Sequence, residues 1–79
     1  MHYATAAPNK ATELLASVKR GEFRLFVSTA MRATVIDAKT IGRFEKANAW
    51  LLKNDGDGYR LRSGKNSVYL LPGQLKIIA

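Results

Sequence analysis

The stretch YRLRSGKNSVYLL, residues 59–71, predicts a β-hairpin and with it an antiparallel sheet. Residues 59–62, in which apolar side chains alternate with arginines, and the mostly apolar residues 67–71 flank residues 63–66, whose residue types favour a tight turn. We therefore expect strands over 59–62 and 67–71. Pro72-Gly73 predicts a further turn, and residues 75–78 allow one more strand.

Upstream of the hairpin, an alternating pattern predicts a strand over residues 23–36. Polar residues between apolar ones are typical of a strand in a half-buried antiparallel sheet. Because the run is long for one strand, we expect a bend or bulge near Thr29-Ala30. The apolar positions expected to share one face are Phe23, Leu25, Val27, Met31 and Val35.

Two further segments have the apolar spacing of a helix. The first covers about residues 9–20, with Asn9 as a suitable N-cap and Gly21 suited to the position after the end. The second begins after Asp37, another suitable N-cap, and ends before the loop at 54–58. The stripe expected on the second helix is Ile41, Phe44, Asn48, Leu51 and Leu52. The pattern does not explain the polar Asn48.

These segments predict an α+β fold with the order α-β-α-β-β and an optional final strand. We expect an antiparallel sheet with the helices packed on one face. A chain of 79 residues is long enough for one core only. We therefore expect a single domain over residues 9–79, preceded by a flexible leader at 1–8.

Composition indicates a soluble, cytoplasmic domain with a basic surface. Thirteen Lys and Arg against six Asp and Glu give a net charge of +7, and the pI is about 10.2. Such a charge favours an anionic partner, either nucleic acid or an acidic protein surface. The absence of cysteine favours the cytoplasm over an oxidising compartment. No apolar run is long enough to span a membrane, so we expect no membrane partner.

The chain offers little for catalysis, a cofactor or a metal. Its only histidine, His2, lies in the expected leader, which disfavours imidazole sites and histidine-based triads. Residues 63–66 lack the glycine spacing of a phosphate-binding loop. Residues 54–58 lack the later glycine and glutamate of a calcium loop. We therefore expect a binding protein rather than an enzyme, with no cofactor and no small-molecule substrate.

One constellation on the second predicted helix indicates a partner-binding face. Its five side chains fall within roughly 80° of arc, opposite the apolar stripe. They are Lys39, Arg43, Lys46, Trp50 and Lys53. A tryptophan among cations is typical of a binding hot spot, and the cations suit phosphates or an acidic protein. The alternative is that these cations are merely solvated and that Trp50 packs under a neighbouring segment.

A second basic surface lies on the hairpin, where we interpret Arg60, Arg62 and Lys65 as candidate nucleic-acid contacts. No acidic residue follows Asp57. A basic hairpin beside a helix resembles the wing of winged-helix DNA-binding domains. That resemblance is partial, because only one helix is expected between the first strand and the hairpin, where that fold needs a helix-turn-helix pair.

The C-terminal part of the chain also resembles a known family. The matching residues are Tyr59-Arg60-Leu61, Gly64-Lys65-Asn66-Ser67-Val68 and Pro72-Gly73-Gln74-Leu75-Lys76-Ile77. They resemble the C-terminal hairpin of a small type I-F anti-CRISPR protein. The resemblance implies a phage-encoded inhibitor that binds a host CRISPR surveillance complex without chemistry. Many anti-CRISPR proteins are acidic DNA mimics, and this basic chain departs from that type.

The leading hypothesis is a phage-encoded, non-enzymatic binding protein in the host cytoplasm. It would inhibit or redirect a nucleoprotein machine, either a CRISPR surveillance complex or RNA polymerase. The alternative is a DNA- or RNA-binding regulator that uses the basic hairpin directly. A third hypothesis is a structural or assembly protein, with Trp50 in an interface between copies.

Overall fold

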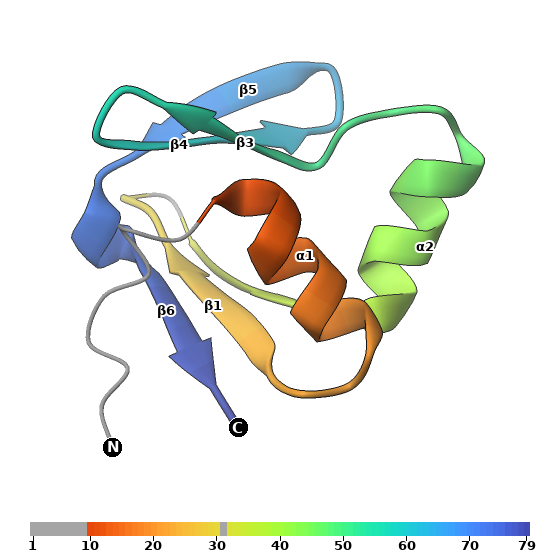
Figure 1. The fold of residues 1–79 in the computed structure, drawn as a ribbon. Helices are drawn as coiled ribbons and strands as arrows, with labels where there is room; N and C mark the ends of the chain where they lie inside the picture. Colours follow the sequence, from red (N-terminus) through yellow and green to blue (C-terminus); the bar gives the residue numbers. More distant parts are fainter. Residues whose placement is uncertain (1–9, 31) are drawn as a thin grey trace.

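The computed structural model describes residues 10–30 and 32–79 and confirms the α+β class. Within these residues, two helices combine with two antiparallel sheets of three strands each (Figure 1). The order is α-β-β-α-β-β-β-β. If the optional final strand is counted in the expected order, the structure has one additional strand before the second helix and one additional strand after it. The expected leader at 1–8 and the N-cap Asn9 lie outside the described residues.

The helices are α1, Ala11–Lys19, and α2, Ala38–Lys46. The strands are β1, Arg24–Ser28; β2, Ala33–Ile36; β3, Leu52–Asp55; β4, Gly58–Ser63; β5, Asn66–Leu70; and β6, Leu75–Ile78. A short 3-10 helix, η1, covers Pro72–Gln74 between β5 and β6. Sheet A has the order β2-β1-β6, and sheet B has the order β3-β4-β5.

The prediction of one strand over residues 23–36 is wrong, because the chain reverses between Ser28 and Ala33 and forms the hairpin β1–β2. Thr29 closes this turn. Its backbone amide and its hydroxyl both donate hydrogen bonds to the carbonyl oxygen of Arg32, each at 2.9 Å. A threonine hydroxyl that bonds to nearby backbone competes with a continuing strand, which explains the reversal where a bend was expected.

The reversal also changes which side chains face the core. Leu25 and Val27 are buried as predicted, and Ile36 is buried opposite Leu25. Val35, which the single-strand pattern assigned to the core face, is 41% exposed. Met31 lies outside the described residues. Strand residues alternate between faces, so this shift in parity follows directly from the new pairing.

Sheet B contains the hairpin that the sequence predicts. β4 and β5 pair through a two-residue turn, Gly64-Lys65, in which Gly64 has φ 62°. The turn between β3 and β4 is built in the same way from Gly56-Asp57, with Gly56 at φ 59°. A left-handed residue at this position suits the tight turns of hairpins. Residues 54–58 therefore close a hairpin instead of ending a helix.

The second helix is shorter than predicted because Asn48 ends it. Asn48 has φ 55°, and the amide of Ala49 donates to the carbonyl of Phe44 at 2.8 Å. A left-handed residue just after the last turn is a common way to end a helix, and asparagine tolerates it. Leu51 and Leu52 are buried as expected, but from the connector and β3 rather than from a helical stripe.

The predicted starts and ends of the helices are otherwise largely confirmed. α1 falls within the predicted range, and Leu14 and Val18 on its apolar face are buried. Gly21 has φ 78° just after the helix, as its position suggested. Asp37 caps α2: its Oδ1 accepts hydrogen bonds from the amide and the hydroxyl of Thr40, each at 2.9 Å.

One core joins the two sheets. α1 lies under sheet B and beside sheet A (Figure 1). Leu25 and Leu75 of sheet A and Tyr59 and Leu70 of sheet B are all fully buried in one cluster. The inner face of sheet B is therefore occupied by the core, and its outer face is left to solvent. Neither helix in the described part of the chain has the length and apolar character to cross a membrane.

Candidate anion-binding surface

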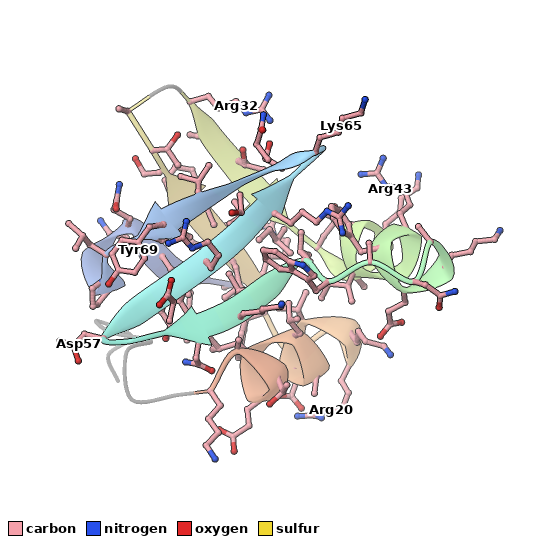
Figure 2. The ribbon with its side chains drawn as sticks, turned by 90° about the horizontal axis from the view of Figure 1, so that it is seen from above. Arg20, Arg32, Arg43, Asp57, Lys65 and Tyr69 are labelled. Atoms are coloured by element: carbon pink, nitrogen blue, oxygen red, sulfur yellow. The ribbon has the colours of Figure 1, made fainter. Side chains whose placement is uncertain are left out.

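The outer face of sheet B carries cations and aromatic rings side by side. Buried residues alternate along β4 with Arg60 and Arg62, so these two arginines point away from the core. Lys53 on β3 and Tyr69 on β5 are the register partners of Arg60. The row Lys53–Arg60–Tyr69 therefore crosses the outer face, which Figure 2 presents from above.

Arg60 is already engaged on this face. Its Nε lies 3.1 Å from Oδ2 of Asp55, and its guanidinium carbon lies 5.6 Å from the centre of the Tyr69 ring. The Tyr69 ring lies close to Gly58: a Cβ added to Gly58 would come within 2.8 Å of the Tyr69 hydroxyl. The missing side chain of Gly58 thus lets the ring lie flat on the sheet. Arg60 has a carboxylate partner, so it is less available to an external anion.

The predicted five-residue face of one helix is wrong, because only Lys39, Arg43 and Lys46 belong to α2. These three are exposed, and their spacing puts them on one side of the helix. Trp50 is partly buried in the connector before β3. Lys53 lies on β3 with its Nζ 4.5 Å from the centre of the Trp50 ring. The Trp50 ring thus contacts the cation of Lys53, which leaves both the binding-face hypothesis and its alternative as predictions.

A hollow of about 290 Å³ lies between the C-terminal end of α2 and the tip of the β4–β5 hairpin. Its lining residues are Arg43, Phe44, Ala47, Ala49, Arg62 and Gly64. Arg43 belongs to the predicted partner-binding group and Arg62 to the predicted nucleic-acid-binding group. The fold therefore brings one member of each predicted group to the same place. The Nε of Arg62 donates a hydrogen bond to the carbonyl oxygen of Gly64 at 3.1 Å, which holds the guanidinium group of Arg62 near the hairpin tip.

Two more cations lie at the same end of sheet B. Arg32, from the turn between β1 and β2, donates from Nη2 to Oγ of Ser63 at 3.3 Å. Lys65 is exposed at the tip of the hairpin. Figure 2 shows Arg32, Lys65 and Arg43 near one another, with Asp57 at the opposite end of the sheet. We call the cluster of Arg32, Arg43, Arg62 and Lys65 the basic end.

No ion pair links the basic end to a carboxylate within the described residues, although the charge of Arg43 helps to lower the pKa of Asp37. Among the described residues, the ion pairs are Lys19–Glu45, Arg20–Glu22 and Arg60–Asp55. None of them includes a cation of the basic end. Four positive side chains thus share one end of the molecule, and none of them forms an ion pair among residues 10–30 and 32–79. This arrangement leaves their charge available to an anion from outside.

Sequence reasoning missed two parts of this surface. Arg32 stands on the polar side of the predicted single strand, and no feature of the sequence distinguishes it from Arg24 on the same side. The apolar floor is the other part. The core assignment of Phe44 is confirmed, because Phe44 packs against the core, but its second place in the lining of the hollow was not predicted. Ala47 carried no signal. α2 ends at Asn48, and the residues on both sides of this end line the hollow together with Arg62 and Gly64 of the β4–β5 hairpin.

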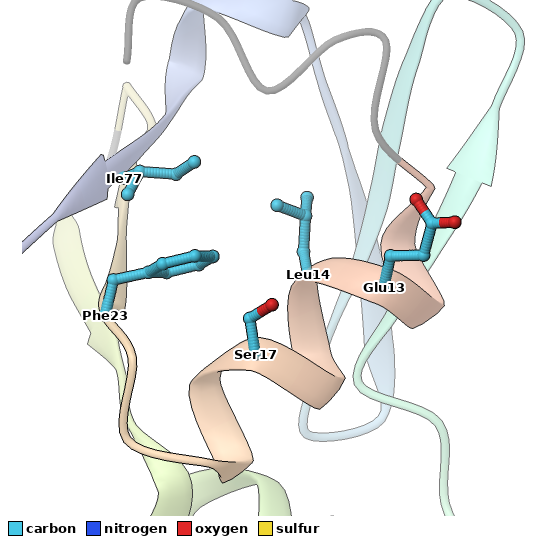
Figure 3. A pocket seen from close by; sticks show the side chains of 5 residues that line it. All are labelled: Glu13, Leu14, Ser17, Phe23 and Ile77. Atoms are coloured by element: carbon cyan, nitrogen blue, oxygen red, sulfur yellow. The ribbon is translucent and has the colours of Figure 1, made fainter. Parts of the chain in front are cut away.

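A second hollow, of about 220 Å³, lies between α1 and sheet A. Figure 3 shows its lining side chains, which are Glu13, Leu14, Ser17, Phe23 and Ile77. Glu13 is the single titratable group among them, so the lining forms no acid–base pair. In the part of the chain that the structure describes, no three His, Cys, Asp or Glu side chains gather closely enough to hold a metal ion.

Comparison with protein-family models, with curated proteins and with solved structures finds no match to this chain.

Proposed function

We propose that this chain is a non-enzymatic binding domain that engages a host nucleoprotein machine and inhibits or redirects it. The observation that carries the proposal is the convergence of Arg43 and Arg62 on one hollow, with Arg32 and Lys65 beside it. Because none of these cations forms an ion pair with a described carboxylate, an anionic surface gains charge-assisted hydrogen bonds when it docks there. The net charge of +7 adds long-range attraction to the same kind of partner.

The kind of machine follows from the resemblance of the C-terminal residues to a small type I-F anti-CRISPR protein. A CRISPR surveillance complex in the cytoplasm of a bacterial host is the first candidate, and RNA polymerase is the second. Both carry nucleic acid in a protein assembly, so both expose phosphates beside protein surfaces. In this proposal the domain is phage-encoded and acts by occupying a site rather than by chemistry.

A second candidate function is a regulator that binds DNA or RNA directly. The β4–β5 hairpin supports it, because Arg62 lies near the hairpin tip and Lys65 is exposed at the tip itself. A cationic tip of this kind has the position of a wing that contacts the phosphate backbone. In that case free nucleic acid binds as well as an assembled machine does.

A binding assay with purified machines tests the proposal. The targets are a type I-F surveillance complex with its guide RNA and a bacterial RNA polymerase, and free duplex DNA serves as a third target. The wild type is compared with Arg43→Ala/Arg62→Ala and with the control Arg24→Ala/Lys76→Ala. The control has the same charge loss on sheet A, where Arg24 bonds to the carbonyl of Ala79.

We expect the wild type to bind one of the two machines and to reduce its DNA binding or its transcription. The basic-end variant should lose this effect, and the control should keep it. Free duplex DNA bound as tightly as either machine favours the direct regulator. If neither machine is bound, or if both variants lose binding equally, the proposal is wrong.

A further inference from the structure

We propose that the hollow beside the basic end is a subsite for one unpaired nucleotide, so that the domain contacts its partner's nucleic acid as a single strand. This inference rests on the proposed function and deepens it. It names the chemical group that is recognised and the residues that recognise it: Arg43 and Arg62 for the phosphate, and Phe44, Ala47 and Ala49 for the base.

The chemistry of the lining requires a ligand with two different parts. The guanidinium groups of Arg43 and Arg62 call for an anion, and their planar donors match phosphate oxygens. The side chains of Phe44, Ala47 and Ala49 call for an apolar surface. A nucleotide carries a flat base and a phosphate next to each other. The hollow is open to solvent, and its volume of about 290 Å³ lies just below the roughly 300–1,000 Å³ of enclosed ligand sites, so it has room for a single nucleotide and little more.

The hollow adjoins the C-terminal end of α2, where the helix dipole is unfavourable to an anion. That end carries about half a negative charge, which salt screens. Arg43 and Arg62 contribute two full positive charges at the hollow, and Arg32 and Lys65 lie nearby. The balance at this place is therefore clearly positive, and a phosphate is attracted in spite of the helix end.

The apolar floor favours an unpaired base over a duplex. In a duplex the bases are stacked inside, and a surface that meets only phosphates leaves an apolar floor uncovered. Proteins that bind single strands combine a cationic groove with apolar or aromatic faces on which unstacked bases lie. Phe44 supplies such a face in the hollow, with small alanines beside it that let a base approach.

The outer face of sheet B, next to the hollow, also carries cations beside aromatic rings. From Arg62 the outer face of sheet B leads to Arg60 with Tyr69, where Asp55 offsets part of the charge, and then to Lys53 with Trp50. Neighbouring outward positions on a strand are about 6.6 Å apart. Cations and aromatic rings thus recur together along a path from the hollow. A nucleic acid strand offers an anion and a ring in every repeat unit, whereas an acidic protein segment offers the anions without regular rings.

Fluorescence anisotropy with labelled oligothymidine and with a duplex of equal length tests this inference, at low and at physiological salt. Arg43→Gln/Arg62→Gln removes the phosphate contacts. Ala47→Glu fills the hollow with a negative side chain at an exposed position, where folding is least affected. The matched control is Arg24→Gln/Lys76→Gln, which removes equal charge from sheet A. Polyglutamate is the competitor that represents an acidic protein. Circular dichroism confirms that each variant is folded.

We expect oligothymidine to bind at least about fivefold more tightly than the duplex, since stacking of one base contributes about 1–3 kcal/mol. The arginine double variant and Ala47→Glu should each weaken oligothymidine binding by about tenfold or more, and the control by less than about twofold. Equal binding of the duplex, an inert Ala47→Glu, or equal competition by polyglutamate would overturn the single-strand subsite.

Failure of this inference is distinguishable from failure of the proposed function. If oligothymidine is not bound but a purified machine is bound through Arg43 and Arg62, the subsite is wrong and the proposed function stands. If neither is bound, both are wrong.

Discussion

The side-chain oxygen of Asn54 on β3 accepts a hydrogen bond from the backbone amide of Ala11, the first residue of α1, at 2.8 Å. Lys10 occupies the N-cap position but makes no side-chain cap. The first amides of a helix have no partner within the helix, and a nearby polar side chain usually satisfies one of them. Here a residue far along the chain does so, and it ties α1 to sheet B.

We predict that Asn54→Ala lowers the free energy of unfolding by about 1 kcal/mol, because it removes this cap. Asn54→Asp keeps an acceptor oxygen and places a negative charge at the start of α1, so it should retain most of the stability. Urea unfolding of the three proteins measures the difference. An Asn54→Ala variant as stable as the wild type would mean that the hydrogen bond does not cap α1 in solution.

Two glycines should respond to alanine with opposite signs. At Gly58 a Cβ would collide with the carbonyl oxygen of Leu70 and approach the Tyr69 hydroxyl to 2.8 Å. We expect Gly58→Ala to cost about 1–3 kcal/mol of unfolding free energy, as overpacking does. Gly42 in α2 has open space around it, so Gly42→Ala should stabilise by about 0.5–1 kcal/mol. Thermal unfolding reports both, and a shift of equal sign in the two variants would contradict the packing of Tyr69 over β4.

Asn48 should be replaceable by glycine but not by alanine. Its φ of 55° is left-handed, and alanine pays about 1–2 kcal/mol for that conformation. Asn48→Gly removes this steric cost. Its free energy of unfolding should therefore exceed that of Asn48→Ala by about 1–2 kcal/mol. Hydrogen exchange at the Ala49 amide, which bonds to Phe44, provides a local readout. Equal stability of the two variants would indicate that α2 continues past residue 48.

The cap of α2 predicts a dependence of stability on pH. A hydrogen bond from the backbone amide of Thr40, and to a smaller extent one from its hydroxyl, hold the pKa of Asp37 below its ordinary value of 3.8. A pKa that is lower in the folded state makes the ionised carboxylate a source of stability above pH 3.8, and that stability is lost as the pH falls through the folded pKa.

Asp37→Asn keeps a capping acceptor and removes this titration. The melting temperature of the wild type should therefore exceed that of Asp37→Asn near neutral pH, and the gap should close as the pH falls below 3.8. Other acidic groups titrate in both proteins and cancel in the comparison. A gap that stays constant across the acid range would exclude a charge contribution from this cap.

Local chemistry made part of this fold predictable. The hairpin β4–β5 follows from the two short strand-like runs on either side of the turn residues at 63–66, and the cap at Asp37 follows from its residue type. The hairpin β1–β2 does not follow in the same way, because it depends on the hydroxyl of Thr29 meeting the carbonyl of Arg32. In a one-dimensional pattern those residues continue the alternation, so the length of the run predicts a bend near Thr29-Ala30 but not a full reversal of the chain.

The end of α2 was missed for a related reason. Leu51 and Leu52 stay in phase with the helical stripe although Asn48 turns the chain away. The same turn creates the hollow, so the candidate site depends on a conformation that the apolar spacing conceals. Arg43 and Arg62 were each candidates from the sequence, but in separate groups. Their common place at the hollow is a property of the fold alone.

Mapping backbone amide shifts by nuclear magnetic resonance tests the central claim most directly, because it locates the site without any substitution. Isotope-labelled protein is titrated with oligothymidine at low salt. We predict that the largest shifts fall around the hollow, at Arg43, Ala47, Ala49 and Gly64, and that the amides of α1 and β6 change little. Shifts concentrated on α1 or β6, with the residues of the hollow unchanged, would contradict a binding site at the basic end.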